Sequence, residues 1–248
     1  MTIRRRFLAA ALACLAATGC AARTQPATTT PAAPTRATGA TAGPTIIQPS
    51  ASPNAAGSPA AAAAARAQRW TFDADPAGGL PQGTEIFSGT WAVRPEADVP
   101  SPPNALCQTG SAEFPAIALG DAAYADVLLV ARVKPISGQQ DQAAGLIFRV
   151  QDKDNYYILR ANALEGNVNL YKYQGGRRSD LKDGQAQVGR GQWQELRVEA
   201  RGTTLRGFLN GQPVVEATDS TFKTAGRIGL WTKSDSVTCF DGVEAQAL

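Results

Sequence analysis

Apolar and polar side chains alternate along most of the chain after residue 68, and this alternation limits the possible folds more than any other feature. In residues 144–150 one face carries Ala, Leu, Phe and Val, and the other carries Gly, Ile and Arg. The same period of two recurs in residues 156–162, 195–201 and 227–231, and no stretch keeps a convincing helical period. A period of two is typical of strands that are buried on one face. We therefore predict an all-β domain.

Turn-forming residues separate these segments at short intervals. Asn210-Gly211 lies between two alternating segments and is a strong signal for a two-residue hairpin. Residues 165–167 and 175–176 also indicate turns. Roughly a dozen short strands spaced in this way predict an antiparallel β-sandwich or jelly roll. We place it in a single domain at residues 68–248.

The first twenty residues have the pattern of a secretory signal peptide. Three arginines at residues 4–6 precede an apolar run that is too short to span a bilayer. Residues 17–20, Ala-Thr-Gly-Cys, resemble a bacterial lipobox, in which the cysteine becomes an acylated N-terminus. Cleavage at Cys14 would leave a shorter apolar run. We predict a signal peptide at residues 1–19 and lipidation of Cys20, with a non-lipidated secreted protein as the alternative.

The export route and the target membrane are less constrained. Residues 4–8, Arg-Arg-Arg-Phe-Leu, also fit the twin-arginine pattern, so both the general and the twin-arginine routes stay open. Ala21 stands where an aspartate commonly retains lipoproteins in the inner membrane. We therefore expect a lipid-anchored protein of the bacterial cell envelope, with the outer membrane favoured.

Residues 20–67 have the composition of a disordered linker. After Cys20 they are almost wholly Ala, Thr, Pro, Ser and Gly, with no acidic or aromatic residue. Such a segment cannot bury enough apolar surface to offset the entropy lost on ordering. A flexible tether of this length has a typical reach of about 40 Å. We predict that it holds the domain away from the membrane.

Charge and composition exclude several classes of function. Six of the 24 basic residues precede residue 68 and all 21 acidic residues follow it, so the predicted domain carries a net charge of about −3. Without a basic stripe, we expect no nucleic-acid partner. The chain has no histidine, which excludes Ser-His-Asp triads and His-ligated zinc. It also lacks phosphate-loop and dinucleotide-binding motifs, and we expect no cofactor.

Five segments together resemble a known superfamily. They are residues 145–149 (Gly-Leu-Ile-Phe-Arg), 154–157 (Asp-Asn-Tyr-Tyr), 160–165 (Arg-Ala-Asn-Ala-Leu-Glu), 168–172 and 229–233 (Gly-Leu-Trp-Thr-Lys). They are similar to the concanavalin A-like lectin/glucanase superfamily, and in particular to the bacterial 3-keto-disaccharide hydrolase or laminin-G-like domains. The resemblance implies a jelly roll whose concave sheet or rim loops usually meet sugars. It does not fix the chemistry, because the superfamily mixes lectins, adhesion modules and glycosidases.

The sequence offers no clear catalytic pair of carboxylates. Glycoside hydrolysis needs two, and glucanases of this fold carry them on one strand as E-x-D-x-x-E, a motif absent here. Glu195 and Glu199 alternate with arginines, which is typical of a solvated charge ladder. The acids near the family motifs lie in or beside turns, and a catalytic pair among them stays an alternative: Asp152, Asp154, Glu165, Asp235 and Asp241. Residues 152–155 have oxygen ligands suited to calcium, but a turn is favoured, so we expect no metal.

Sugar recognition is easier to assign to this sequence than catalysis. Alternation places one set of planar side chains opposite the predicted core residues: Arg149, Tyr156, Arg160, Asn162 and Trp231. If the strands are in register, these side chains converge on one sheet face, where rings pack against sugar C–H groups and polar groups bind hydroxyls. In the alternative, the two aromatic residues pack beneath a loop and the arginines pair with neighbouring acids.

Cys107 and Cys239 are the two cysteines of the predicted domain. An even number in an exported protein suggests a disulfide, and the terminal strands of the fold that the resemblance implies commonly pair. We predict a disulfide between them, with two separate buried thiols as the alternative.

These observations favour a membrane-anchored envelope lipoprotein whose jelly roll binds a carbohydrate or glycan. Its expected partners are this glycan and the lipid bilayer, through acylated Cys20. One alternative is a hydrolase of a (3-keto-)disaccharide or another glycoside, and a second is a structural or protein-binding envelope module. We expect a binding protein rather than an enzyme, and assign no catalytic residue.

Overall fold

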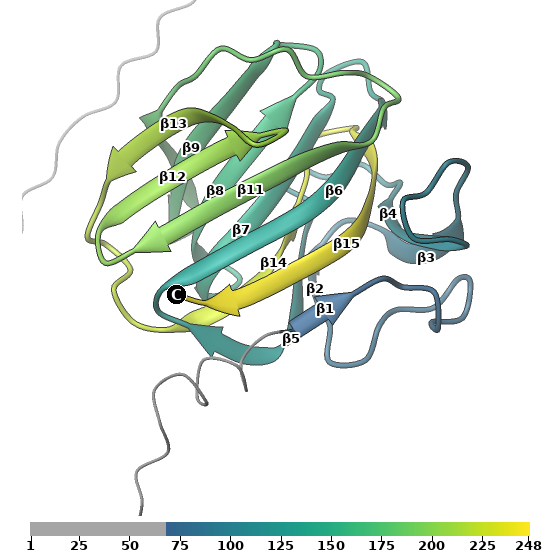
Figure 1. The fold of residues 1–248 in the computed structure, drawn as a ribbon, viewed down its shortest axis with the longest axis horizontal. Helices are drawn as coiled ribbons and strands as arrows, with labels where there is room; N and C mark the ends of the chain where they lie inside the picture. Colours follow the sequence, from purple (N-terminus) through teal and green to yellow (C-terminus); the bar gives the residue numbers. More distant parts are fainter. Residues whose placement is uncertain (1–67) are drawn as a thin grey trace, which may run out of the picture. The chain divides into compact units, whose positions relative to one another are not determined.

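Fifteen strands and no helix form residues 68–248, the part of the chain that the computed structural model describes. Every pair of neighbouring strands is antiparallel. Two sheets lie one in front of the other, which confirms the predicted antiparallel sandwich (Figure 1). The predicted signal peptide, Cys20 and the linker lie outside the described residues. Residues 68–248 contain no helix long and apolar enough to cross a membrane.

The first sheet, called sheet A here, lies in front in Figure 1 and contains eight strands. Its spatial order is β13 (Gln212–Thr218), β12 (Thr204–Leu209), β11 (Gln194–Arg201), β6 (Val127–Ser137), β15 (Val237–Ala247), β4 (Asn104–Gln108) and β3 (Trp91–Pro95). The eighth strand, β1 (Gln68–Trp70), pairs with β15.

The second sheet, sheet B, contains seven strands. Its spatial order is β10 (Arg177–Lys182), β9 (Asn167–Gln174), β8 (Asn155–Asn162), β7 (Ala143–Asp152), β14 (Gly226–Trp231), β5 (Ala116–Tyr124) and β2 (Glu85–Ser88). Strands β7 to β10 follow one another in both sequence and space, whereas β14 inserts between β7 and β5. The segments that resemble the superfamily lie in or beside the strands at the centre of this sheet.

The core fills the space between the two sheets. Leu146, Phe148 and Leu230 enter it from sheet B, and Leu129 and Val198 enter it from sheet A. All five side chains are fully buried. The predicted alternation is therefore confirmed for both sheets, and each strand turns its other side chains outward.

The predicted hairpin at Asn210-Gly211 is confirmed. The two residues join β12 to β13, and both have positive φ angles, of 49° and 76°. Two-residue hairpins of the type that matches the strand twist need positive φ at both central positions, which Asn and Gly adopt most readily.

Cys107 and Cys239 form a disulfide, as predicted. They lie directly opposite each other in the register of β4 and β15, and the S–S distance is 2.02 Å. The bond joins the two strands across 132 residues of sequence.

The outward face of β11 carries the predicted charge ladder. Glu195 lies 3.4 Å from Arg132 on β6, and Arg197 lies 3.5 Å from Glu199. These pairs are partly exposed on sheet A, so they contribute little to stability. Both glutamates pair with arginines on this face, and we give them no catalytic role.

Candidate functional site

The outward face of sheet B is aromatic rather than polar. We call it the aromatic face and define it by Phe87, Phe114, Tyr156, Tyr171, Tyr173 and Trp231. An antiparallel sheet normally turns an apolar face to the core and a polar face to water. Here Tyr156 and Trp231 are buried on the outer side, in contact with the half-buried rings of the other members. The ring of Tyr171 is also buried, and the guanidinium groups of Arg160 and Arg178 lie over it. Such a surface is typical of a binding site.

The strand register sets the middle of this face. Trp231 on β14 lies opposite Gly145 on β7, and Gly145 lies opposite Arg160 on β8. A Cβ atom on Gly145 would lie 3.0 Å from Cε3 of Trp231, so the indole occupies the space that the glycine leaves. The glycine in the alternating segment therefore makes room for the largest side chain of the face.

The rings of the aromatic face pack against one another. The ring of Tyr156 lies 4.9 Å from Tyr173, its partner across β8 and β9, and 6.5 Å from Phe87. The ring of Phe114 lies 5.7 Å from Trp231 in a stacked arrangement, and 5.6 Å from Tyr173 edge-on. Tyr156 and Trp231 are therefore covered, and Phe87, Phe114 and Tyr173 are the more exposed rings of the face. Burial raises the pKa of the Tyr156 hydroxyl, which stays protonated at neutral pH.

Two hollows open beside these rings. The first has a volume of about 190 Å³ and is lined by Phe87, Ser88, Glu113, Phe114, Lys153, Asp154, Tyr156 and Tyr173. The second has a volume of about 410 Å³ and shares Phe87 and Lys153 with the first. Lys153 and Asp154 form an exposed ion pair of 2.6 Å at the rim. Aromatic walls with a few polar groups at the edge are the usual lining of a small-ligand site.

Arg160 and Asn162 lie on the same face, but their side chains bind the turn that follows β8. Arg160 Nη2 donates to Glu165 at 2.6 Å and to Asn167 at 2.7 Å. Asn162 donates to the buried Asp141 and accepts from the backbone N–H groups of the following turn. Burial alone would raise the pKa of Glu165, but hydrogen bonds from Asn167 and Arg160 outweigh it and lower that pKa.

The predicted placement of Arg149 is wrong. Arg149 has a φ of 50°, and the register of β7 with β8 shifts between Phe148 and Asp152, so a bulge interrupts the alternation there. Its buried guanidinium donates to the carbonyls of Ala125 at 2.6 Å and Phe222 at 3.0 Å. The structure therefore brings together four of the five predicted residues and leaves Arg149 out. Their predicted role in binding remains a prediction.

The central strands of sheet B hold no carboxylate on their outward face. The outward residues of β7, β8 and β14 before the bulge are Ala143, Gly145, Ile147, Tyr156, Ile158, Arg160, Asn162, Gly229 and Trp231. Asp152 accepts hydrogen bonds within its own turn, as the turn interpretation expects. Asp235 accepts the backbone N–H groups of residues 139–141, which lower its pKa. The buried Asp241 accepts from Ser101 and Gly242.

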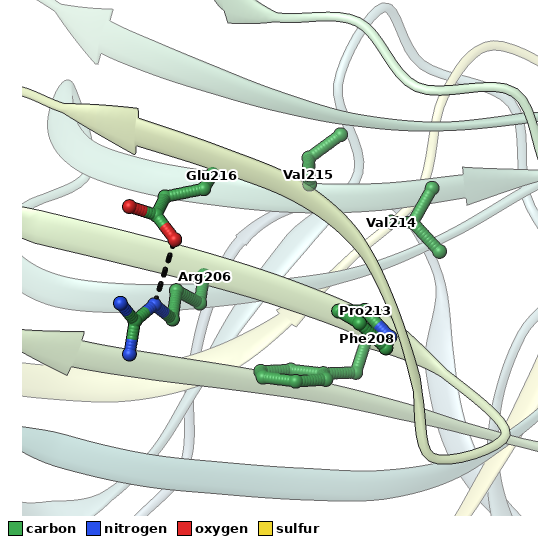
Figure 2. Close-up of a pocket in the computed structure, with 6 residues that line it drawn as sticks. All are labelled: Arg206, Phe208, Pro213, Val214, Val215 and Glu216. Carbon is green, nitrogen blue, oxygen red and sulfur yellow. Dashed lines mark hydrogen bonds and ion pairs between the residues drawn. The ribbon is translucent and has the colours of Figure 1, made fainter.

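A hollow also lies on sheet A, at the hairpin of β12 and β13 (Figure 2). It has a volume of about 390 Å³ and is lined by Arg206, Phe208, Pro213, Val214, Val215 and Glu216. Arg206 and Glu216 form an exposed ion pair of 2.8 Å. The ring of Phe208 is buried, and the guanidinium of Arg197 covers it at 3.9 Å. This hollow has one buried ring, whereas the aromatic face brings three half-buried rings together, so the aromatic face is the better candidate.

Among residues 68–248, Glu96, Cys107 and Cys239 bring atoms of the metal-ligating type within 4.8 Å of one another. The two sulfurs are bonded to each other and offer no thiolate. This group therefore does not hold a metal.

The exposed part of the site was missed by the sequence analysis. Tyr173 continues the alternation of Tyr171 along β9, and that period of two was the available signal. Phe87 lies in the short edge strand β2, and Phe114 lies in the loop before β5. Neither is flanked by a run of alternating apolar and polar residues that would have indicated its position. Arg178, whose guanidinium lies over the rings of Phe114 and Tyr171, belongs to the polar edge strand β10, whose sequence shows no alternation of apolar and polar residues.

Residues 104–244 match the model of one domain family, the 3-keto-alpha-glucoside-1,2-lyase-like domain. The chain belongs to this family. The match covers most of both sheets and nearly all of the aromatic face, with Phe87 outside it. The resemblance to 3-keto-disaccharide hydrolase domains is thereby confirmed. No curated protein matches the chain.

Solved structures confirm the concanavalin A-like fold. Carbohydrate-binding module CBM66 from Bacillus subtilis matches with a TM-score of 0.58 and 22% identity, over 66% of this chain and 96% of that one. A Bacillus licheniformis β-glucanase matches with a TM-score of 0.51 and 12% identity, over 73% and 98%. Domain 4 of AbnA, an arabinanase of Geobacillus stearothermophilus solved with arabinotriose, matches with a TM-score of 0.50 and 15% identity, over 72% and 90%. At these identities the likeness shows the fold alone.

Proposed function

We propose that this protein is a glycan-binding domain that a lipid anchor displays in the bacterial cell envelope. The observation that carries the proposal is the set of half-buried rings of Phe87, Phe114 and Tyr173 beside a hollow on the outer face of sheet B. Aromatic rings pack against the C–H side of a pyranose, and polar rim groups bind its hydroxyls. The structural neighbours that carry sugars or belong to sugar-binding modules are consistent with this use of the fold.

Binding is favoured over hydrolysis because the central strands of sheet B present no carboxylate outward. The two acids that line the first hollow are Glu113, which is exposed, and Asp154, which is paired with Lys153. A glycosidase needs two carboxyl groups on either side of the scissile bond, about 5–10 Å apart. The outward residues of β7, β8 and β14 before the bulge supply none. Glu165 is held by Arg160, and its lowered pKa makes it a poor general acid at neutral pH.

A glycan array with the purified full-length protein tests the proposal. We expect at least one class of glycan to bind, and Phe114→Ala and Tyr173→Ala each to weaken that binding at least tenfold. Trp193→Ala is the matched control, because Trp193 is a half-buried aromatic residue outside the aromatic face. Circular dichroism checks that each variant is folded. Undiminished binding by both face variants would contradict the proposal.

The anchoring part of the proposal rests on the sequence. Residues 1–20 have the pattern of a lipoprotein signal, and the linker that follows is long enough to span about 40 Å. A disulfide in the domain is consistent with export to an oxidising compartment. The outer membrane is the favoured location, on its periplasmic or outer side.

The family match favours a second candidate function, cleavage of a 3-keto-glycoside. Any such enzyme must act without histidine, since the chain has none. Incubation of the full-length protein with a 3-keto-disaccharide, followed by chromatography of the products, separates the two functions. Release of the free sugar at a rate above that of a heat-denatured sample would establish cleavage, and an unchanged disaccharide supports binding alone.

A further inference from the structure

The guanidinium of Arg178 lies on the aromatic face and has no hydrogen-bond acceptor or ion-pair partner among residues 68–248. It lies on β10, directly opposite Tyr173 on β9. Its Cζ atom lies 4.5 Å from the ring centre of Tyr171 and 5.3 Å from that of Phe114. Its Nη1 atom is buried without a hydrogen-bond partner. Two rings therefore hold the group in place, and no acceptor in residues 68–248 uses it.

Arg178 differs in this from the other arginines that are shielded from water. Five arginines of residues 68–248 are buried or half-buried: Arg149, Arg160, Arg178, Arg197 and Arg227. Each of the other four forms an ion pair with an aspartate or glutamate of the domain. A charge that is partly removed from water is costly unless it is paired. The partner that Arg178 lacks within the domain is a negative charge.

A guanidinium presents its N–H groups in a planar fork that matches both oxygens of a carboxylate. The rings of Tyr171 and Phe114 reduce the freedom of this fork, so little entropy is lost when a ligand binds. The hydroxyls of a neutral sugar would accept hydrogen bonds here but would leave the charge unpaired.

We propose that the glycan bound by the aromatic face is acidic, and that Arg178 binds the carboxylate of a uronic acid residue. This inference rests on the proposed glycan-binding function. A pyranose packed against Tyr173 would lie beside Arg178, because Arg178 is paired with Tyr173 in the sheet and lies over the neighbouring ring of Phe114. Asp180 follows Arg178 by two residues on β10, on the same face, and Glu113 is next to Phe114 in the sequence. Both acids are exposed and disfavour a densely charged polyanion, so we expect one carboxylate per site.

Matched pairs of glycans test this proposal. The probes are oligogalacturonates, alginate oligosaccharides and glucuronate-containing oligosaccharides, each beside its carboxyl-reduced form with the same linkages. Isothermal titration calorimetry uses the full-length protein. We expect at least one acidic form to bind at least tenfold more tightly than its reduced form. Arg178→Gln should remove this difference, and Arg178→Lys should retain only part of it, because lysine lacks the fork.

Arg177→Gln is the control, because it removes the same charge from the neighbouring position, whose side chain leaves the strand on the other face. It should leave the preference intact. Equal binding of acidic and reduced forms, with sensitivity to Tyr173→Ala retained, would overturn the acidic ligand while the glycan-binding function stands. A folded Arg178→Gln variant that keeps the preference would overturn the role of Arg178 in the same way. Absence of binding to every acidic form would overturn the acidic ligand, whereas the glycan-binding function would be overturned only if the glycan array also showed no binding.

Discussion

The indole of Trp231 lies over Gly145, its partner across β14 and β7. A Cβ atom on Gly145 would lie 3.0 Å from Cε3 and 3.2 Å from Cβ of Trp231. Phe114 stacks against the indole, with 5.7 Å between the ring centres. Gly145 thus leaves the space that the indole of Trp231 occupies, and the indole in turn packs against the half-buried ring of Phe114. The shape of the aromatic face therefore depends on this glycine.

Gly145→Val should therefore disturb both stability and the face. The branched side chain cannot fit beneath the indole, and overpacking of this kind costs about 1–3 kcal/mol of unfolding free energy. Denaturant unfolding measures the loss, and tryptophan fluorescence reports the displacement of the indole. Ser179→Val, at an exposed position of β10, is the control and should change stability little. If Gly145→Val has wild-type stability and emission, the indole does not depend on the space above Gly145.

Much of the fold follows from local patterns in the sequence. Alternation in residues 144–150 places Leu146 and Phe148 in the core, and Asn210-Gly211 closes a hairpin, because both effects act over a few neighbouring residues. The insertion of β14 between β7 and β5 depends on contacts between distant segments. No local pattern encodes that order, so the register of Trp231 against Gly145 could not be predicted.

The candidate site was only partly predictable for the same reason. The alternation of side chains along each strand places four predicted residues on one side of sheet B, as the structure shows: Tyr156, Arg160, Asn162 and Trp231. It failed for Arg149, because a bulge changes the count of residues along the strand. Alternation also does not indicate which residues cover an outward side chain. Phe114, which covers Trp231, lies in a loop, where no alternation exists. The accessible surface is therefore made by residues whose positions only the folded chain determines.

The disulfide should make a large contribution to stability. Cys107 and Cys239 are separated by 132 residues, and the loss of a bond that closes so long a loop typically costs about 2–5 kcal/mol. The double variant Cys107→Ala/Cys239→Ala should lose this amount in denaturant unfolding. A reducing agent should destabilise the wild type and leave the variant unchanged. Intact mass should rise by two hydrogens on reduction of the domain, and the absence of that shift would show that the bond does not form.

Cys20 should carry the lipid, because residues 17–20 resemble a lipobox. Cys20→Ser should abolish incorporation of labelled palmitate and release the protein from the membrane fraction. Cys14→Ser is the matched control, since Cys14 lies within the predicted signal peptide and is removed on cleavage. It should leave labelling unchanged. Labelling that depends on Cys14 instead would move the cleavage site and shorten the predicted signal peptide.

Asp219 closes the loop between β13 and β14 at the edge of the core. It accepts hydrogen bonds from the Tyr157 hydroxyl at 2.5 Å and the Thr221 backbone at 2.8 Å, and it lies 3.3 Å from Lys172 Nζ. Burial alone would raise its pKa, but these hydrogen bonds outweigh burial and lower the pKa from 3.8 to about 2. Burial and the bond to Asp219 also raise the pKa of Tyr157 to about 12, so the hydroxyl remains a donor at neutral pH.

The stability of the domain should therefore fall in acid through Asp219. A carboxyl group with a lower pKa in the folded state stabilises it when ionised, and the shift corresponds to about 2 kcal/mol. This contribution is complete above the unfolded pKa of 3.8 and is lost as the pH falls towards 2. Urea unfolding of wild type and Asp219→Asn should show a gap in unfolding free energy that is widest above pH 5 and closes towards pH 2. Asp183→Asn, at an exposed position, should show no such gap. A gap that stays constant across this range would mean that the Asp219 side chain stabilises the loop by packing alone, because only the ionised carboxylate contributes a term that acid removes.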